Sequence, residues 1–319
     1  MINSGMMICS FYLKERFRRN QEIFYPLNHE YQAKEDPQVY ADVFDMMRAF
    51  CEANYSFSDD EKNRKMFSVG TDSIVLYDES TYRAMSFTIR SGAYGIESDM
   101  TDRRTKEVKY RRKSDDADIK DFKCLMFVPK DEGEVEVTKG IFIFQTVATY
   151  GVKTISTKQM RAFFAGLGLT LETRSVSIRA FVEKLVEQGD LYKVTLIKDR
   201  LSPNHADNML ISTGREERSY IKPQLQPVWF QKLMLFFDRA SKTTIYEIDG
   251  EIFDDIKVEF KLGSKYRTVG LKFIDKLSVV EDVPDTIYKD GRFKEETLIK
   301  HMIETAIAYK EKMVMSEGQ

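Results

Sequence analysis

The sequence predicts an α+β protein, with a central mixed sheet, a helix pair in the middle of the chain and a C-terminal β-meander closed by a helix. Three patterns favour this class. Residues 140–146 hold a continuous apolar run, which is typical of a strand buried on both faces. Residues 156–186 carry apolar side chains at helical spacing. Residues 243–280 alternate between apolar and polar side chains, as half-exposed strands do.

The length of 319 residues is enough for more than one domain. We expect three parts, because the dominant pattern changes twice along the chain. They are an N-terminal α+β domain over residues 1–150, a helix-rich segment over 151–200, and a C-terminal β-rich region with its closing helix over 201–319.

The N-terminal part predicts several strands and one helix. Asp36-Pro37 is expected to open the helix, because aspartate caps helices and proline is tolerated in their first turn. The last two strands should pair in the central sheet. The expected strands are Ile8–Leu13, Ser73–Tyr77, Ala84–Ile89, Lys123–Val128 and Gly140–Thr146.

Residues 97–121 are dense in charge and poor in large apolar side chains. Such a segment buries too little apolar surface to offset the entropy of ordering, so we expect an exposed loop or hairpin tip. Its basic residues could clamp phosphates, although the aspartates at 115–118 would neutralise them locally.

The helix pair is expected between residues 156 and 189. Ser156 and Gln159 form a capping box at its start, and Gly166-Leu167-Gly168 should end the first helix. A second apolar stripe follows at 178–186, and then an alternating strand at 191–197. The first stripe consists of Met160, Phe163, Phe164 and Leu167.

This order of helix, turn, helix and strand over Ser156–Lys198 resembles a winged helix. In that family the second helix enters the major groove of DNA and the next strand begins the wing. The resemblance implies a nucleic-acid contact, and residues 151–200 carry a supporting net charge of +4. The alternative is an ordinary helix and strand of an α/β domain. The implied contact residues are Arg174, Ser177, Arg179, Lys193, Lys198 and Arg200.

A second pattern, Glu259-Phe260-Lys261 on a predicted strand, resembles the E-x-K strand of the PD-(D/E)xK nucleases. That resemblance implies a Mg²⁺ site in which Asp249 or Asp255 acts with Glu259 and Lys261. The alternative is an amphipathic strand whose polar side chains only face water while the intervening apolar ones face the core. Those core-facing residues are Ile256, Val258 and Phe260.

The composition excludes several other classes. The net charge is −2, and the three cysteines are too few and too distant for a disulfide framework, which favours a reducing cytoplasm. No apolar stretch reaches the 18 residues that a membrane helix needs. Neither a P-loop nor a Rossmann phosphate-binding motif occurs, and G-x-S-x-G and H-E-x-x-H are also absent.

We therefore expect a cytoplasmic protein of prokaryotic or phage type that contacts DNA or RNA and is not catalytic. No cofactor or metal is expected, except Mg²⁺ under the nuclease alternative, and no membrane. A third hypothesis is a protein-interaction subunit of a larger complex, whose aromatic and methionine side chains dock a protein partner.

Overall fold

The computed structural model divides the chain into two compact units. The larger unit comprises Met1–Arg174 with Val280–Glu311, and the smaller unit comprises Ser175–Val279 with Lys312–Gln319. The structure describes residues 4–15, 24–33, 38–148, 150–175, 190–199, 214–223, 246–248, 251–262, 265–270, 279–284, 287–289 and 292–315.

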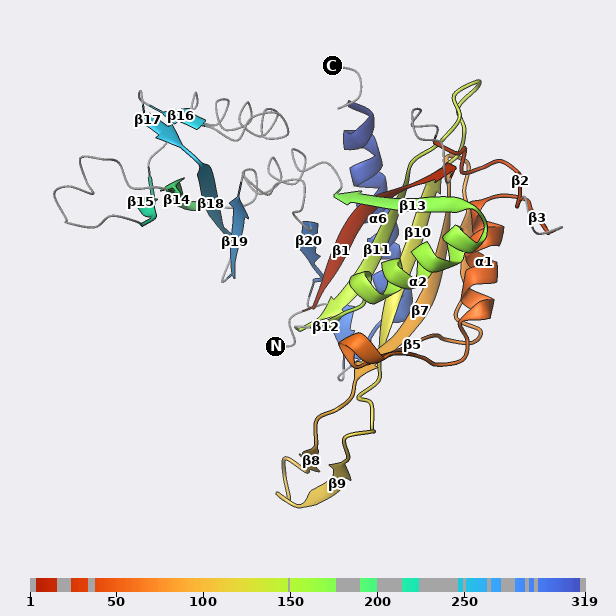
Figure 1. Ribbon diagram of the computed structural model, residues 1–319, viewed down its shortest axis with the longest axis horizontal. Coiled ribbons are helices and arrows are strands. Elements are labelled where there is room, and N and C mark those ends of the chain that lie inside the picture. The colour runs from red at the N-terminus through yellow and green to blue at the C-terminus, as the bar shows by residue number, and fades with distance from the viewer. Residues whose placement is uncertain are drawn as a thin grey trace. The chain divides into compact units, whose positions relative to one another are not determined.

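The larger unit is built on a ten-stranded sheet, whose main path runs β13-β1-β11-β10-β7-β5-β4 (Figure 1). Three further strands pair at its margins: β12 with β11, β20 with β1, and β6 with β7. The strands are β1 (Ser4–Glu15), β4 (Ser58–Asp60), β5 (Lys65–Val69), β6 (Val75–Asp78), β7 (Tyr82–Ala93), β10 (Lys120–Pro129), β11 (Gly140–Val147), β12 (Tyr150–Gly151), β13 (Leu169–Ser175) and β20 (Val279–Asp282).

The predicted pairing of the two strands after residue 120 is confirmed, with Cys124 opposite Phe144 and Phe127 opposite Ile141. β1 lies on the other side of β11, where Phe11 faces Gly140. A Cβ atom on Gly140 would lie 2.3 Å from the Phe11 ring, so glycine allows the ring to cross this point and stack on Phe142.

Helices cover both faces of this sheet, which explains its two-sided apolar strands. α1 (Val43–Ala53) and α2 (Lys153–Gly166) share a buried cluster with Phe11, Phe87 and Phe144 on one face. α6 (Glu295–Met315) lies behind the sheet in the view of Figure 1, whereas α2 crosses in front. The run Ile141–Phe144 is accordingly buried on both faces, as predicted. None of the helices in the described residues combines the length and apolar character that a membrane crossing requires.

The smaller unit contains a four-stranded antiparallel sheet in the order β15-β14-β18-β19 and a separate hairpin of β16 and β17. Its strands are β14 (Asp190–Lys198), β15 (Glu216–Ile221), β16 (Tyr246–Ile248), β17 (Glu251–Phe253), β18 (Asp255–Leu262) and β19 (Lys265–Gly270). The remaining short elements of the chain are β2 (Tyr31–Gln32), β3 (Val39–Tyr40), η1 (Glu61–Asn63), β8 (Ser98–Thr101), β9 (Val108–Arg112), β21 (Tyr288–Lys289) and β22 (Arg292–Phe293).

The predicted α+β class with a mixed sheet and a winged-helix-like pair is wrong. Strands make up half of the described residues and helices about a fifth, and the large sheet is antiparallel. The helix α2 ends at Gly166 as expected, and Gly168 has a positive φ of 80°. The chain then enters strand β13, because Leu169 and Leu171 alternate with exposed Thr170 and complete the sheet beside β1. The second predicted stripe, 178–186, lies outside the described residues.

Two predicted helix starts are also wrong. α2 begins at Lys153, so the hydroxyl of Ser156 bonds to the carbonyl of Val152 inside the helix instead of capping it with Gln159. α1 begins at Val43, where Asp42 is the cap, and not next to Asp36-Pro37. The spacing of apolar residues predicted the position of each helix. It did not predict the first residue of the helix, which depends on where the preceding strand ends.

The closing helix forms as predicted, but it does not close a C-terminal meander. Up to Glu311, α6 belongs to the larger unit, where Glu295 pairs with Lys123 of β10 and the Tyr309 hydroxyl donates to Glu281 of β20 at 2.7 Å. The reason is β20, which returns the chain to the large sheet beside β1. The Val283 N–H donates to the Ser4 carbonyl at 3.1 Å and holds this return.

Candidate nucleic-acid interface

Of the predicted nucleic-acid residues, the structure describes Arg174 in the larger unit and Lys193 and Lys198 in the smaller one. Arg174 is the next-to-last residue of β13 and is exposed. Its guanidinium donates twice to Glu172, at 3.0 and 3.1 Å, and lies 5.3 Å from the Tyr12 ring centroid. Ser177, Arg179 and Arg200 lie outside the described residues.

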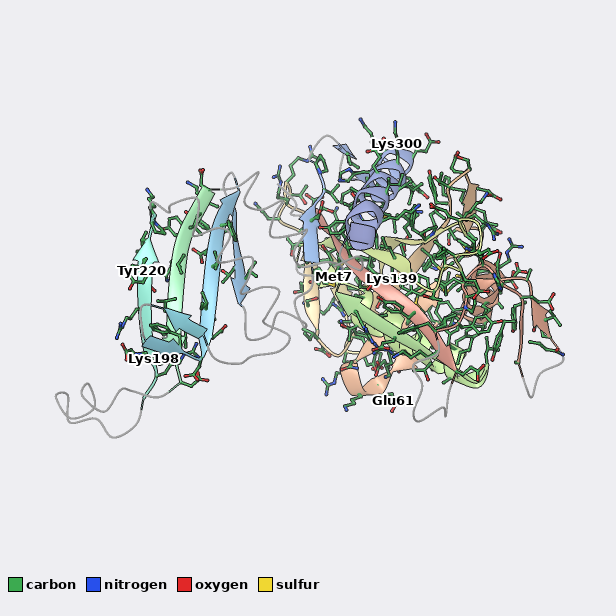
Figure 2. All side chains as sticks on the ribbon, turned by 90° about the horizontal axis from the view of Figure 1, so that it is seen from above. Met7, Glu61, Lys139, Lys198, Tyr220 and Lys300 are labelled. Atoms are coloured by element: carbon green, nitrogen blue, oxygen red, sulfur yellow. The ribbon has the colours of Figure 1, made fainter. Side chains whose placement is uncertain are left out.

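Lys193 and Lys198 lie on β14 of the smaller unit. The ammonium group of Lys198 is 4.9 Å from the Phe253 ring centroid, and Lys193 stands directly opposite Glu259 of β18. Lys198 and Tyr220 are both seen on the strands of this sheet in Figure 2. Lys193 thus lies on the same sheet face as Glu259, a residue of the nuclease hypothesis.

The residues of the nuclease hypothesis do not form a metal site in the part of the chain that the structure describes. Asp255 is buried at the start of β18, whereas Lys261 is exposed near its end. Glu259 accepts a hydrogen bond of 3.2 Å from the Thr268 hydroxyl. Asp249 lies outside the described residues, and the described ones contain no group of three His, Cys, Asp or Glu that could hold a metal ion. The intervening Ile256, Val258 and Phe260 are buried.

The larger unit carries a largely exposed hairpin, which we call the arm and define as residues 96–118. β8 and β9 pair along it, and it projects beyond the ends of β5 and β7 (Figure 1). Every residue of β8 is exposed, and so are all residues of β9 except Arg112. The prediction of an exposed hairpin tip in this segment is confirmed.

The tip of the arm is an ordered turn around Asp102. The Asp102 carboxylate accepts the N–H groups of Arg104 at 2.8 Å and Thr105 at 2.9 Å, and its carbonyl accepts the Lys106 N–H at 2.9 Å. The two N–H groups, that of Thr105 foremost, hold the pKa of Asp102 below its usual value. The turn is therefore stabilised by a carboxylate that stays ionised.

Three cations stand on this turn. The side chains of Arg103, Arg104 and Lys106 are exposed, and none has an ion-pair partner among the described residues. The acidic groups of the two strands are engaged instead: Asp99 pairs with Arg111 at 2.8 Å, and Glu107 lies 3.8 Å from Lys109. The tip therefore carries three exposed cations that form no ion pair in the described part of the chain, beside the hydrogen-bonded carboxylate of Asp102.

The base of the arm is held by Asp116. Its carboxylate accepts the Tyr110 hydroxyl and the Lys113 N–H, which together lower its pKa, the hydroxyl most. Arg112 donates to the carbonyls of Asp116 and Ala93, which ties the end of β9 to β7. This network orients the arm on the sheet.

The predicted neutralisation of the basic run by the aspartates at 115–118 holds at the base of the arm, where Asp116 lies beside Arg112 and Lys113. Residues 98–113 contain seven basic and three acidic side chains, a net charge of +4, and the later aspartates lie at the base. There Asp116 accepts hydrogen bonds from the arm itself, and Asp118 pairs with Lys120 of β10. These aspartates therefore act at the base, whereas Arg103, Arg104 and Lys106 stand on the turn; over residues 96–118 the arm carries seven basic and seven acidic side chains.

No family model, no curated protein and no solved structure matches the chain.

Proposed function

We propose that the protein is a non-catalytic, nucleic-acid-contacting protein, and that the tip of the arm makes the contact. One observation carries the proposal: Arg103, Arg104 and Lys106 are exposed, without an ion-pair partner in the described part of the chain, on an ordered turn that projects from the larger unit. Exposed cations that form no ion pair are suited to replace the counterions of a phosphate backbone.

The hydrogen bonds of the turn support a role in binding, and not only in keeping the protein soluble. A flexible basic loop must lose conformational entropy when it binds, whereas the hydrogen bonds to Asp102 already fix the backbone that carries Arg103 and Arg104. Arginine also suits phosphate, because its guanidinium donates in a planar fork. The arm therefore presents its cations at a small entropic cost.

The cysteines support a reducing cytoplasm and a non-catalytic role. Cys9, Cys51 and Cys124 are all buried and none forms a disulfide. Burial raises the pKa of Cys9 to about 11 and that of Cys51 to about 12, so both stay protonated at neutral pH. A protonated, inaccessible thiol is no nucleophile.

The proposal is tested by the combined Arg103→Ala, Arg104→Ala and Lys106→Ala variant. Its nucleic-acid affinity should fall, and each lost phosphate contact should remove about 0.9 from the slope of log K against log salt on duplex DNA. The measurement is a salt titration by fluorescence anisotropy on both duplex and single strands.

The matched control removes the same charge elsewhere in the larger unit, through Arg48→Ala, Lys62→Ala and Lys300→Ala, all exposed positions. This control should keep the wild-type slope. Equal losses in both triple variants would show a general charge effect, and an unchanged slope in the arm variant would remove the proposal.

The non-catalytic part has its own test. Wild-type protein incubated with Mg²⁺ or Mn²⁺ should leave duplex and single-stranded nucleic acid intact, because the described residues assemble no metal site around Glu259. Cleavage that disappears in Glu259→Ala, with the thermal midpoint unchanged, would restore the nuclease hypothesis.

A further inference from the structure

We infer that the ligand of the arm is duplex DNA, and that the arm lies in the major groove. This inference rests on the proposed function, since it names the class of nucleic acid that the same residues contact. Its support is the cross-section of the arm, the chemistry of its faces and its aromatic content.

The cross-section fits only one groove. Two paired strands lie about 4.8 Å apart, and with their side chains they match a major groove about 12 Å wide but not a minor groove about 6 Å wide. β8 spans four residues from Ser98 to Thr101. At about 3.3 Å per residue it extends about 10 Å along the groove when one face of the ribbon lies toward the base edges. The major groove of A-form RNA is too deep and narrow for such a ribbon.

The two faces of the arm differ in charge. Met100 stands opposite Tyr110, and Ser98 opposite Arg112, so these four residues form one face. None of the four is acidic, and the Asp116 carboxylate that accepts the Tyr110 hydroxyl comes from the base of the arm. Asp99 and Arg111 stand opposite each other on the other face. The first face is therefore the one that can approach base edges without bringing a strand carboxylate toward DNA. We call it the groove face.

The groove face offers apolar contact. Met100 is 59% exposed and Tyr110 is 50% exposed, although an isolated ribbon gains nothing by holding such side chains in water. The major groove presents the thymine methyl group, which is an apolar partner at the base edge. The tip cations Arg103, Arg104 and Lys106 then reach the phosphates at the margin of the groove.

Single strands fit the arm less well. Proteins that bind unpaired nucleotides stack successive bases on several aromatic rings. Tyr110 is the only aromatic residue between positions 96 and 118, and its hydroxyl is bonded to Asp116 at the base of the arm. One tethered ring cannot form a stacking platform.

The test compares wild-type affinity for duplex DNA, duplex RNA and single-stranded DNA of one sequence, and then for two modified duplexes. Uracil in place of thymine removes the major-groove methyl, and inosine in place of guanine removes the minor-groove amino group. Duplex DNA should bind best, uracil should weaken binding by roughly fourfold per contacted methyl group, and inosine should have no effect.

Met100→Ala should abolish the uracil effect and leave the salt slope unchanged. The matched control is Val135→Ala, which shortens another exposed apolar side chain, 70% exposed, outside the arm. A uracil effect that persists in Met100→Ala would overturn the assignment of the groove face.

The remaining outcomes separate this inference from the proposed function. Tighter binding to single strands or duplex RNA, or sensitivity to inosine but not to uracil, would overturn the major-groove inference while tip-dependent binding still stands. Absence of binding to every nucleic acid, or binding that the alanine variant of the tip does not change, would overturn both.

Discussion

At the scale of single residues, Asp42 links a helix to the sheet. One carboxylate oxygen accepts the N–H groups of Phe44 at 2.7 Å and Asp45 at 3.1 Å, and the other pairs with Arg83 of β7. The Arg83 guanidinium lies 4.4 Å from the centroid of the Phe44 ring. Asp42 thus fixes the start of α1 against the strand it covers.

Two substitutions of Asp42 separate these roles. Asp42→Ala removes the cap and the ion pair, and should lower the free energy of unfolding by about 2–3 kcal/mol. Asp42→Asn keeps an acceptor for the helix N–H groups, so it should cost only about 1 kcal/mol. Chemical denaturation measures both values. Equal losses would show that the amide does not preserve the cap.

The helix pair shows at the residue level why part of the fold was not predictable. Met160 and Phe164 are fully buried on α2, as the apolar spacing indicates. The short stretch from Leu169 to Ser175 reads equally well as a turn before a second helix. Leu169 and Leu171 alternate with polar residues, but this alternation identifies a strand only because β1 is available to pair with it at the edge of the sheet.

At the scale of elements, the sequence predicted where strands of the large sheet lie in the chain better than it predicted which strands pair. Hairpin neighbours such as β6 and β7 follow from a polar turn between two apolar runs. The pairing of β1 with β11 and of β20 with β1 joins segments far apart in the chain, and local periodicity carries no information about it.

For the arm, too, the sequence predicted part of the candidate site but not the pairing of its side chains. Its charge density predicted exposure, and its basic residues were recognised as possible phosphate contacts. Which cations stay unpaired depends on the register that places Asp99 beside Arg111 and on the turn that engages Asp102. Spacing alone therefore did not show that Asp116 acts on Arg112 and Lys113 at the base and not on the cations of the tip.

At the scale of the whole molecule, α6 is the element that returns the C-terminal part of the chain to the large sheet. Leu298, Met302 and Ala306 are fully buried, whereas Lys300 on the same helix is exposed and points away from the sheet (Figure 2). The larger unit is therefore completed by residues from both ends of the chain, and residues 175–279 form a unit between them.

Met302→Ala tests this assignment. It should destabilise the larger unit by about 2–5 kcal/mol, because it removes a fully buried side chain, whereas Lys300→Ala should stay within about 0.5 kcal/mol of wild type. Hydrogen exchange locates the effect: amides of β10 and β11 should lose protection and those of β14 and β18 should not. The reverse pattern would place α6 on the smaller sheet.

The central claim is that the tip of the arm contacts nucleic acid, and trypsin cleavage tests it in the wild-type protein. Without DNA, trypsin should cut first within Arg103–Lys113, because these basic side chains are exposed on a projecting hairpin. Saturating duplex DNA should slow cleavage after Arg103, Arg104 and Lys106 in proportion to occupancy, while cuts outside the arm in the same reaction keep their rate. An unchanged rate at the three tip positions with DNA bound would contradict the account.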